Sequence, residues 1–200
     1  MSEPHRLSPV SVAALGLLVE RDMHPYEMYQ LLVQRREDRL VKVSPGTLYR
    51  AVERLEHDGL ITSRGAEREG NRPERTVYAV TDSGVHALRD GVADRLRTYE
   101  NEYPQFPLAI GEAHNLPVDQ VIALLEERRV SLRELRDFVD DSFRGIVEGG
   151  VDRRHVLHVS YWQTMLAAED AWLVELLGDL RDGSVPWPEP RTGPCPSPTH

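Results

Sequence analysis

The sequence VSPGTLYRAVERLEHDG, residues 43–59, has the clearest helix punctuation in the chain. Ser44 is a residue type that caps helices, Pro45 suits the first helical position, and Gly59 is typical of the residue that follows a helix. This pattern predicts a helix that begins after Ser44 and stops before Gly59.

This helix is expected to have two unlike faces, because residues three or four apart lie on the same side. The apolar side consists of Leu48, Ala51, Val52 and Leu55. The opposite side consists of Thr47, Arg50 and Arg54. We expect the first side to be buried and the second to present two guanidinium groups and a hydroxyl outward.

Two helices are expected before this stretch. Residues 8–21 begin with a capping serine and a proline and are nearly all apolar, which indicates burial on several sides. A turn at 22–24 leads to a second helix over about 25–34, and the polar residues 35–40 are expected to form a loop.

The hydrophobic period changes after the helix. Residues 60–64 and 76–80 are short β-prone runs, and Gly70-Asn71 between them is a turn signal. This indicates a hairpin with an extended tip at 65–75. The arginines of the tip are Arg68, Arg72 and Arg75.

Helix, helix, capped helix and hairpin is the element order of a winged helix-turn-helix. An α-helix fits the DNA major groove, and the unpaired N–H groups at its N-terminus suit phosphates. We therefore predict contact with double-stranded DNA by the exposed side of helix 43–59 and by the hairpin. The expected DNA-contacting residues are Ser44, Thr47, Tyr49, Arg50, Arg54, Arg68, Arg72 and Arg75.

Another interpretation stays open for the same arginines. Carboxylates at Glu53, Glu56 and Asp58 lie on the same helix and could neutralise them. The arginines would then form an ordinary solvated helix face. A further alternative is a winged-helix module for protein–protein interaction that does not bind DNA, in which the arginine face meets an acidic partner.

Several motifs resemble the PadR family of bacterial regulators. They are Leu15-Gly16-Leu17-Leu18, Met23-His24-Pro25-Tyr26-Glu27, the run Ser-Pro-Gly-Thr-Leu-Tyr at 44–49, Arg54-Leu55-Glu56 with Gly59-Leu60-Ile61, Arg72-Pro73-Glu74-Arg75-Thr76-Val77-Tyr78, and Thr81-Asp82-Ser83-Gly84. The resemblance covers about residues 7–88, and beyond them only the order of elements is similar.

The resemblance implies a homodimeric winged helix, usually a repressor released by a small effector, with a variable helical C-terminal part for dimerisation. Such a dimer would bind a pseudo-palindromic operator. The sequence departs from the family at Pro25, where glycine is usual. Arg50 occupies a position that varies in the family, so its role as a base reader rests on helix geometry alone.

Thr81 caps a further helix, whose apolar residues recur every three or four positions up to Pro104. Two long helices are expected over about 117–147 and 152–180, separated by Gly149-Gly150. Each has a stripe of alternating three- and four-residue spacing, which is typical of helices that pack on partner helices. The polar exceptions within the stripes are Arg128, Ser142, Gln163 and Asp170.

These elements predict a mainly α protein, a winged helix-turn-helix with a two-stranded β wing and a C-terminal helical dimerisation domain. The expected divisions are a DNA-binding domain over 1–82, a connecting helix over 83–104, a helical dimerisation or effector domain over 105–181, and a disordered proline-rich tail over 182–200.

The charge distribution qualifies the DNA-binding prediction. The formal net charge is −9, from 24 Lys and Arg against 33 Asp and Glu. Residues 1–80 hold 12 of each class, so all the excess acid follows residue 80. Because phosphates must be met by cations, a basic surface in this neutral region must come from the placement of its arginines.

Other function classes find little support. Neither a Gly-rich phosphate loop, a G-x-S-x-G elbow nor an H-E-x-x-H pair is present, so no enzyme activity and no catalytic residue is expected. His155 and His158 lack a third ligand, so neither a metal nor a cofactor is expected.

The single cysteine, Cys195, excludes an intrachain disulfide. The absence of a signal-peptide pattern and of an apolar run of about 18 residues favours the cytoplasm and argues against a membrane.

Three large side chains mark the last long helix. They are Trp162, Met165 and Trp172, beside its apolar stripe. Packing in a core or a dimer interface is the simpler interpretation, and a pocket for a small aromatic effector is the alternative.

Overall fold

The structure, a computed structural model, describes residues 6–67 and 75–187. The chain divides into two compact units, Met1–Asn101 and Glu102–His200, and each is described by itself. The described residues are mainly helical and include one two-stranded sheet, as the sequence predicts.

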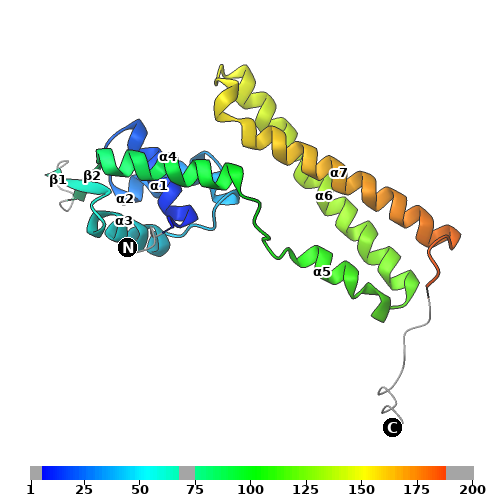
Figure 1. The fold of residues 1–200 in the computed structure, drawn as a ribbon. Coiled ribbons are helices and arrows are strands. Elements are labelled where there is room, and N and C mark those ends of the chain that lie inside the picture. The colour runs from blue at the N-terminus through cyan, green and yellow to red at the C-terminus, as the bar shows by residue number, and fades with distance from the viewer. Residues whose placement is uncertain (1–5, 68–74, 188–200) are drawn as a thin grey trace, which may run out of the picture. The chain divides into compact units, whose positions relative to one another are not determined.

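The first unit begins with three helices (Figure 1). They are α1 (Pro9–Glu20), α2 (Pro25–Gln34) and α3 (Pro45–His57). Each starts with a proline, directly after a residue whose side chain accepts a hydrogen bond from a first-turn N–H. Proline suits this position because its φ is fixed and its missing N–H would have no partner in the helix. The loop expected over 35–40 contains a short 3-10 helix, η1 (Glu37–Arg39).

Pro25 is therefore compatible with the fold, although it departs from the PadR pattern. It is buried at the first position of α2, and the preceding His24 is the N-cap. The His24 Nδ1 atom accepts a hydrogen bond from the Tyr26 N–H at 3.0 Å.

The core of the first unit lies between these helices and the start of the sheet. Its fully buried large side chains are Leu15, Leu18, Met23, Met28, Leu32, Leu48, Val52, Leu55 and Ile61. Burying a side chain of this kind contributes about 1.5–3 kcal/mol each, so this cluster dominates the stability of the unit.

The wing consists of β1 (Ile61–Glu67) and β2 (Arg75–Val80), which pair antiparallel. The register shifts between Ser63 and Ala66, where Gly65 has a φ of 106° that favours glycine. Pairing then resumes, so β1 continues beyond residue 64, where the β-prone run was expected to end.

The turn between α1 and α2 is also tied to the sheet. The Met23 N–H donates to the Tyr78 carbonyl and the Tyr78 N–H to the Met23 carbonyl, both at 3.1 Å. These two hydrogen bonds attach β2 of the wing to the turn that precedes α2.

A close backbone contact joins the wing to α4 (Asp82–Arg97). The Thr81 hydroxyl accepts from the Gly84 N–H at 3.1 Å and can donate to the Gly59 or Leu60 carbonyl, at 2.9 and 3.0 Å. A Cβ atom added at Gly84 would lie 2.0 Å from the Leu60 oxygen. Only glycine therefore fits this position in the Thr81–Gly84 motif.

The prediction that the fourth helix continues to Pro104 is wrong, since α4 ends at Arg97. The apolar spacing continues, but Leu96, Tyr99 and Tyr103 are 84%, 93% and 79% exposed. A helix end that buries no apolar face has little to stabilise it. Tyr103 also precedes a proline, which disfavours the helical conformation, and has a φ of 50°.

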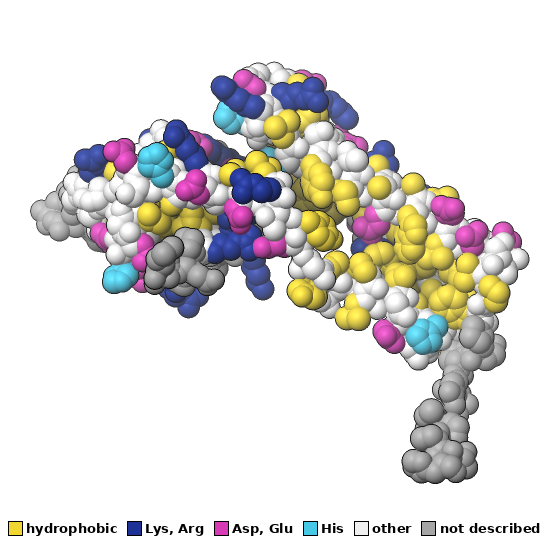
Figure 2. All heavy atoms as spheres, in the orientation of Figure 1, with side chains coloured by type: hydrophobic (Ala, Val, Ile, Leu, Met, Phe, Trp, Pro, Cys, Tyr) yellow, Lys and Arg dark blue, Asp and Glu magenta, His cyan; other side chains and the backbone are white. Residues whose placement is uncertain are grey.

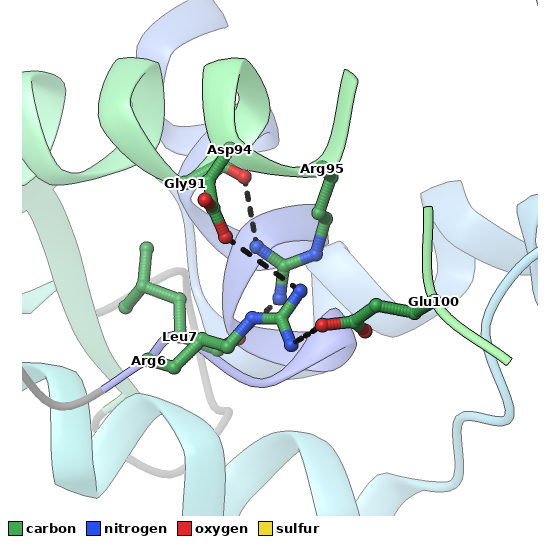
Figure 3. A network of polar contacts seen from close by, with 6 residues as sticks. All are labelled: Arg6, Leu7, Gly91, Asp94, Arg95 and Glu100. Atoms are coloured by element: carbon green, nitrogen blue, oxygen red, sulfur yellow. Dashed lines mark hydrogen bonds and ion pairs between the residues drawn. The ribbon is translucent and has the colours of Figure 1, made fainter. Parts of the chain in front are cut away.

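Polar contacts attach the N-terminal arm to α4 (Figure 3). Arg6 pairs with Asp94 and Glu100. Arg95 donates to the carbonyl of Gly91 and reaches across to the carbonyl of Leu7. One arginine thus reaches from the arm to Asp94 and Glu100, and the other reaches from α4 to the arm.

The second unit is helical throughout its regular structure. Its elements are α5 (Gln105–Gly111), η2 (Ala113–Asn115), α6 (Val118–Glu148), η3 (Arg153–His155) and α7 (Leu157–Asp182). Helices α6 and α7 lie side by side in Figure 1 and pack on each other. The two predicted stripes therefore face each other within one chain, with Val121, Leu125, Leu132, Val139, Val159, Leu166, Leu173 and Leu177 buried between them.

Most of the polar exceptions in the stripes pair across the two helices. The pairs are Arg128 with Glu169 at 2.7 Å, Arg129 with Asp170 at 2.9 Å, and Gln163 with Asp140 at 2.7 Å. From Arg128 to Asp140 the residue number rises on α6, whereas that of the partner falls from Glu169 to Gln163 on α7, so the helices are antiparallel. These pairs fix their register.

Two features of this unit differ from the sequence expectations. Helix α5 was not predicted. Val185 and Trp187 were assigned to the tail but pack on the helices, and the Trp187 Nε1–H donates to the Leu116 carbonyl at 2.9 Å. Residues 188–200, the rest of the expected tail, lie outside the described part.

We predict that Gly84→Ala lowers the free energy of unfolding by about 1–3 kcal/mol, because the new Cβ must displace the Leu60 backbone. Urea denaturation followed by circular dichroism measures the change. Gly91→Ala is the matched control on the same helix, since its Cβ would have ordinary contacts and a better helix former would replace glycine. Equal stability of the two variants would contradict the close contact.

Candidate nucleic-acid interface

Helix α3 has the two faces that the sequence predicts. Leu48, Ala51, Val52 and Leu55 are buried. Arg50 and Arg54 are exposed on the other side. The side chains expected to meet a partner are therefore accessible, and the apolar residues attach the helix to the core.

Arg50 and Arg54 have no ion-pair or hydrogen-bond partner among the described residues, although Glu53 and Glu56 are on the same helix. Other arginines of the first unit are engaged. The pairs are Arg6 with Asp94 and Glu100, Arg21 with Glu27, Arg35 with Glu20, and Arg64 with Asp22. The alternative interpretation, in which carboxylates on the same helix neutralise Arg50 and Arg54, is thus not seen within the described chain.

Ser44 and Thr47 are occupied with each other at the start of α3. The Ser44 Oγ accepts from the Thr47 N–H at 3.2 Å, and the Thr47 Oγ1 accepts from the Ser44 N–H at 2.8 Å. The Thr47 hydroxyl also donates to the Ser44 carbonyl at 3.0 Å. Both hydroxyls therefore cap the helix, which limits their freedom to bind anything else.

Tyr49 lies at the edge of the exposed face, with 39% of its surface accessible. Its ring meets the His24 ring edge-on, with 6.2 Å between centroids and an angle of 73°. This contact joins the start of α2 to the exposed side of α3.

A second contact joins α3 to the wing. The Tyr78 hydroxyl on β2 donates to the Glu56 carboxylate at 3.2 Å. Burial, followed by the nearby Glu56 carboxylate, raises the pKa of Tyr78 above its ordinary value. Tyr78 therefore remains the proton donor, and the contact holds Glu56 toward the wing.

The wing arginines are only partly described. Arg68 and Arg72 lie outside the described residues, and Arg75 begins β2. Arg64 was not singled out in the sequence because it falls in a predicted strand. It is exposed and lies 3.6 Å from Asp22.

Lys42 is a further cation that the sequence interpretation missed. It is exposed two residues before the Ser44 cap and has no partner among the described residues. The available signal was its position between two valines, since alternation of that kind predicts an outward side chain.

The candidate effector residues lie on α7 but differ in environment. Trp162 packs against the core of the helix pair, whereas Met165 and Trp172 are 49% and 42% exposed. Trp172 meets Phe106 of α5 edge-on at 6.1 Å, and the Arg128 guanidinium lies 3.6 Å from the centre of the Phe106 ring. Aromatic surface is thus gathered where α5 meets α6 and α7.

Within the described chain, no helix is both long and apolar enough to span a bilayer.

The first unit is a winged helix-turn-helix, and the second is an antiparallel helix pair with a shorter helix at one end. Residues 14–90 match the family model of the transcriptional regulator PadR-like family. This part of the chain is thus similar to that family. No curated protein sequence matches the chain.

The fold is that of solved PadR structures. Bacillus subtilis PadR in complex with operator DNA is 19% identical, with a TM-score of 0.75, covering 86% of this chain and 99% of that one. The same regulator in complex with p-coumaric acid is 17% identical, with a TM-score of 0.71, covering 90% and 99%. The PadR-like regulator BC1756 from Bacillus cereus is 14% identical, with a TM-score of 0.63, covering 87% and 99%.

We predict that Ser44→Ala lowers the free energy of unfolding by about 1 kcal/mol, because the Thr47 N–H loses its cap. Ser44→Asp should retain stability, since aspartate is also a good N-cap and its charge favours a helix N-terminus. Urea denaturation of both variants checks this. A stable Ser44→Ala protein would show that the reciprocal cap contributes little.

Proposed function

We propose that this protein is a sequence-specific DNA-binding regulator that reads its operator with the exposed face of α3. The observation that carries the proposal is that Arg50 and Arg54 are accessible and unpaired among the described residues, while the opposite face of the helix is buried. The chain has a net charge of −9, yet this face of α3 presents two accessible guanidinium groups.

The geometry suits a major groove. A helix inserted by its N-terminal half brings residues of the first two turns to the base edges. Arg50 lies in the second turn and can reach the O6 and N7 atoms of guanine, and Arg54 follows one turn later. Ser44, Thr47 and Tyr49 lie at the entrance, where contacts to the phosphate backbone are expected. Because the Ser44 and Thr47 hydroxyls already cap the helix, a phosphate contact there would share them with the cap. Arg68, Arg72 and Arg75 of the wing complete the proposed surface along the flanking backbone.

The proposed active form is a homodimer on a pseudo-palindromic operator. The α6 and α7 stripes bury each other, yet large apolar side chains remain exposed on α7, and Figure 2 shows hydrophobic side chains gathered over this unit. These are Leu157, Tyr161 and Val174, which are 49–68% exposed. Exposed apolar surface of this kind marks contacts between proteins, and a second copy would cover it.

Repression relieved by a small effector is the proposed mode of regulation. A structurally similar regulator has been crystallised both with operator DNA and with p-coumaric acid. In this chain, Trp172 offers accessible apolar surface next to Phe106, and Met165 is exposed two turns earlier on α7. We propose that a small aromatic effector binds there, and that Trp162, which packs against the core of the same helix pair, contributes to the site.

The DNA-reading role predicts that Arg50→Ala loses roughly 1–3 kcal/mol of binding free energy on the specific operator and less on random duplex. Footprinting on the DNA upstream of the protein's own gene identifies the operator duplex. Fluorescence anisotropy then measures the affinity for this duplex and for a random one. Titration at stoichiometric concentrations should give two chains per operator. Arg89→Ala on α4 is the matched control, since it removes an exposed arginine that also lacks a partner among the described residues.

The Ser44→Asp variant adds a second test, because it keeps the cap but brings a negative charge toward phosphate. It should fold like the unchanged protein and bind every duplex more weakly. If the unchanged protein binds no duplex but retains an acidic protein partner through Arg50 and Arg54, the protein–protein module replaces this proposal.

The effector proposal predicts that p-coumaric acid and related aromatic acids change the tryptophan fluorescence in a saturable way. Trp172→Phe should weaken this binding more than Trp187→Phe, because Trp187 is held at the far end of α7. Variants at Trp162 and Trp172 that both bind as well as the unchanged protein would remove these residues from the site.

A further inference from the structure

We propose that Lys42 is a second DNA-positioning residue, which contacts a backbone phosphate beside the entrance of α3. This inference rests on the proposed DNA-binding function and adds a contact outside the helix. Lys42 is the single lysine in a chain with 24 Lys and Arg.

The first argument is the direction of the side chain. Burial alternates along the segment before α3, where Val41 is 9% exposed, Lys42 is exposed, Val43 packs against the core and Ser44 is exposed. Successive side chains of an extended segment point to opposite sides. Lys42 therefore points to the same side as Ser44, away from the core.

The position of Lys42 is fixed from both directions. The Val41 N–H donates to the Glu37 carbonyl at 3.0 Å, and Val41 is buried. On the other side, Ser44 is fixed by the reciprocal cap with Thr47. A charge between two anchored neighbours keeps its place relative to α3 although its own side chain is free to move.

The second argument is the absence of a competing carboxylate. Lys42 has no ion pair among the described residues, whereas the four arginines Arg6, Arg21, Arg35 and Arg64 of the same unit do. The cations of this unit that lack a partner in the described part are Lys42, Arg50, Arg54, Arg89 and Arg97. Three of these five lie on α3 or within three residues of its start.

The chemistry of lysine suits a phosphate rather than a base. Its ammonium group is a compact point charge on a flexible stem, without the planar fork with which arginine reads guanine. The edge of the groove entered by α3 is lined by phosphates, and Lys42 lies ahead of the helix on its outward side. The expected contact orients the helix and carries no sequence information.

Salt dependence gives the first test. Each neutralised phosphate contributes about 0.9 to the slope of log affinity against log salt, so Lys42→Ala should reduce the magnitude of that slope by about 0.9 per bound chain. Specific and random duplexes should lose affinity by the same factor. Lys42→Arg should restore the slope, and Arg89→Ala should leave it unchanged. Equal melting temperatures would exclude a folding defect.

The single lysine permits a second, direct test on the unchanged protein. The N-hydroxysuccinimide ester of acetic acid modifies only Lys42 and the chain's α-amino group, and mass spectrometry separates the two. Saturating duplex should protect Lys42 several-fold relative to the α-amino group. An acidic polymer without duplex geometry, such as polyglutamate, should protect it less.

The outcomes separate this inference from the function on which it rests. If the unchanged protein binds no duplex, both are overturned. If it binds DNA and loses affinity in Arg50→Ala, but Lys42→Ala keeps the full salt slope or Lys42 is acetylated equally with and without duplex, only the Lys42 contact is overturned. A reduced slope restored by arginine, together with protection by duplex, supports the contact.

Discussion

The burial of one side of α3 is the constraint on which the rest of the first unit depends. Leu48, Val52 and Leu55 are at most 1% exposed and pack into the core formed with α1 and α2. The helix cannot rotate about its axis without bringing these side chains into water, at a cost of several kcal/mol. The same packing therefore decides the direction in which Arg50 and Arg54 point. The packing that stabilises the core therefore also fixes the geometry of the candidate interface.

Charge pairing complements this packing. In the second unit, arginines of α6 are engaged by carboxylates of α7, as in Arg128 with Glu169 and Arg129 with Asp170. These arginines fix the register of α6 against α7, and their side chains are only partly accessible to solvent. Arg50 and Arg54 of α3, by contrast, have no carboxylate partner among the described residues, so the net charge of the chain alone is a poor guide to its partners.

The sequence was most informative where structure is determined locally. Proline after a capping residue correctly marked the starts of α1 and α3, and the three- and four-residue spacing correctly marked the inner face of α3. It failed where a contact distant in sequence decides the outcome. The apolar spacing after Arg97 predicted more helix than forms, because no described residue packs on Tyr99 or Tyr103 strongly enough to bury them. The capping role of Ser44 was predicted, whereas that of the Thr47 hydroxyl was not, since capping and DNA contact favour the same residue types.

The indole of Trp187 has a mechanical consequence for the long helices. At one end, α6 and α7 are joined by the short connection through η3, and at the other the Trp187 Nε1–H holds the carbonyl of Leu116, just before α6. The antiparallel pair is thus connected at both ends, covalently through η3 and by a hydrogen bond from Trp187. Helix termini are ordinarily among the first parts of a protein to open. Here the segment after α7 is tied to the residue before α6, so fraying at this end of the pair must also break the Trp187 contact.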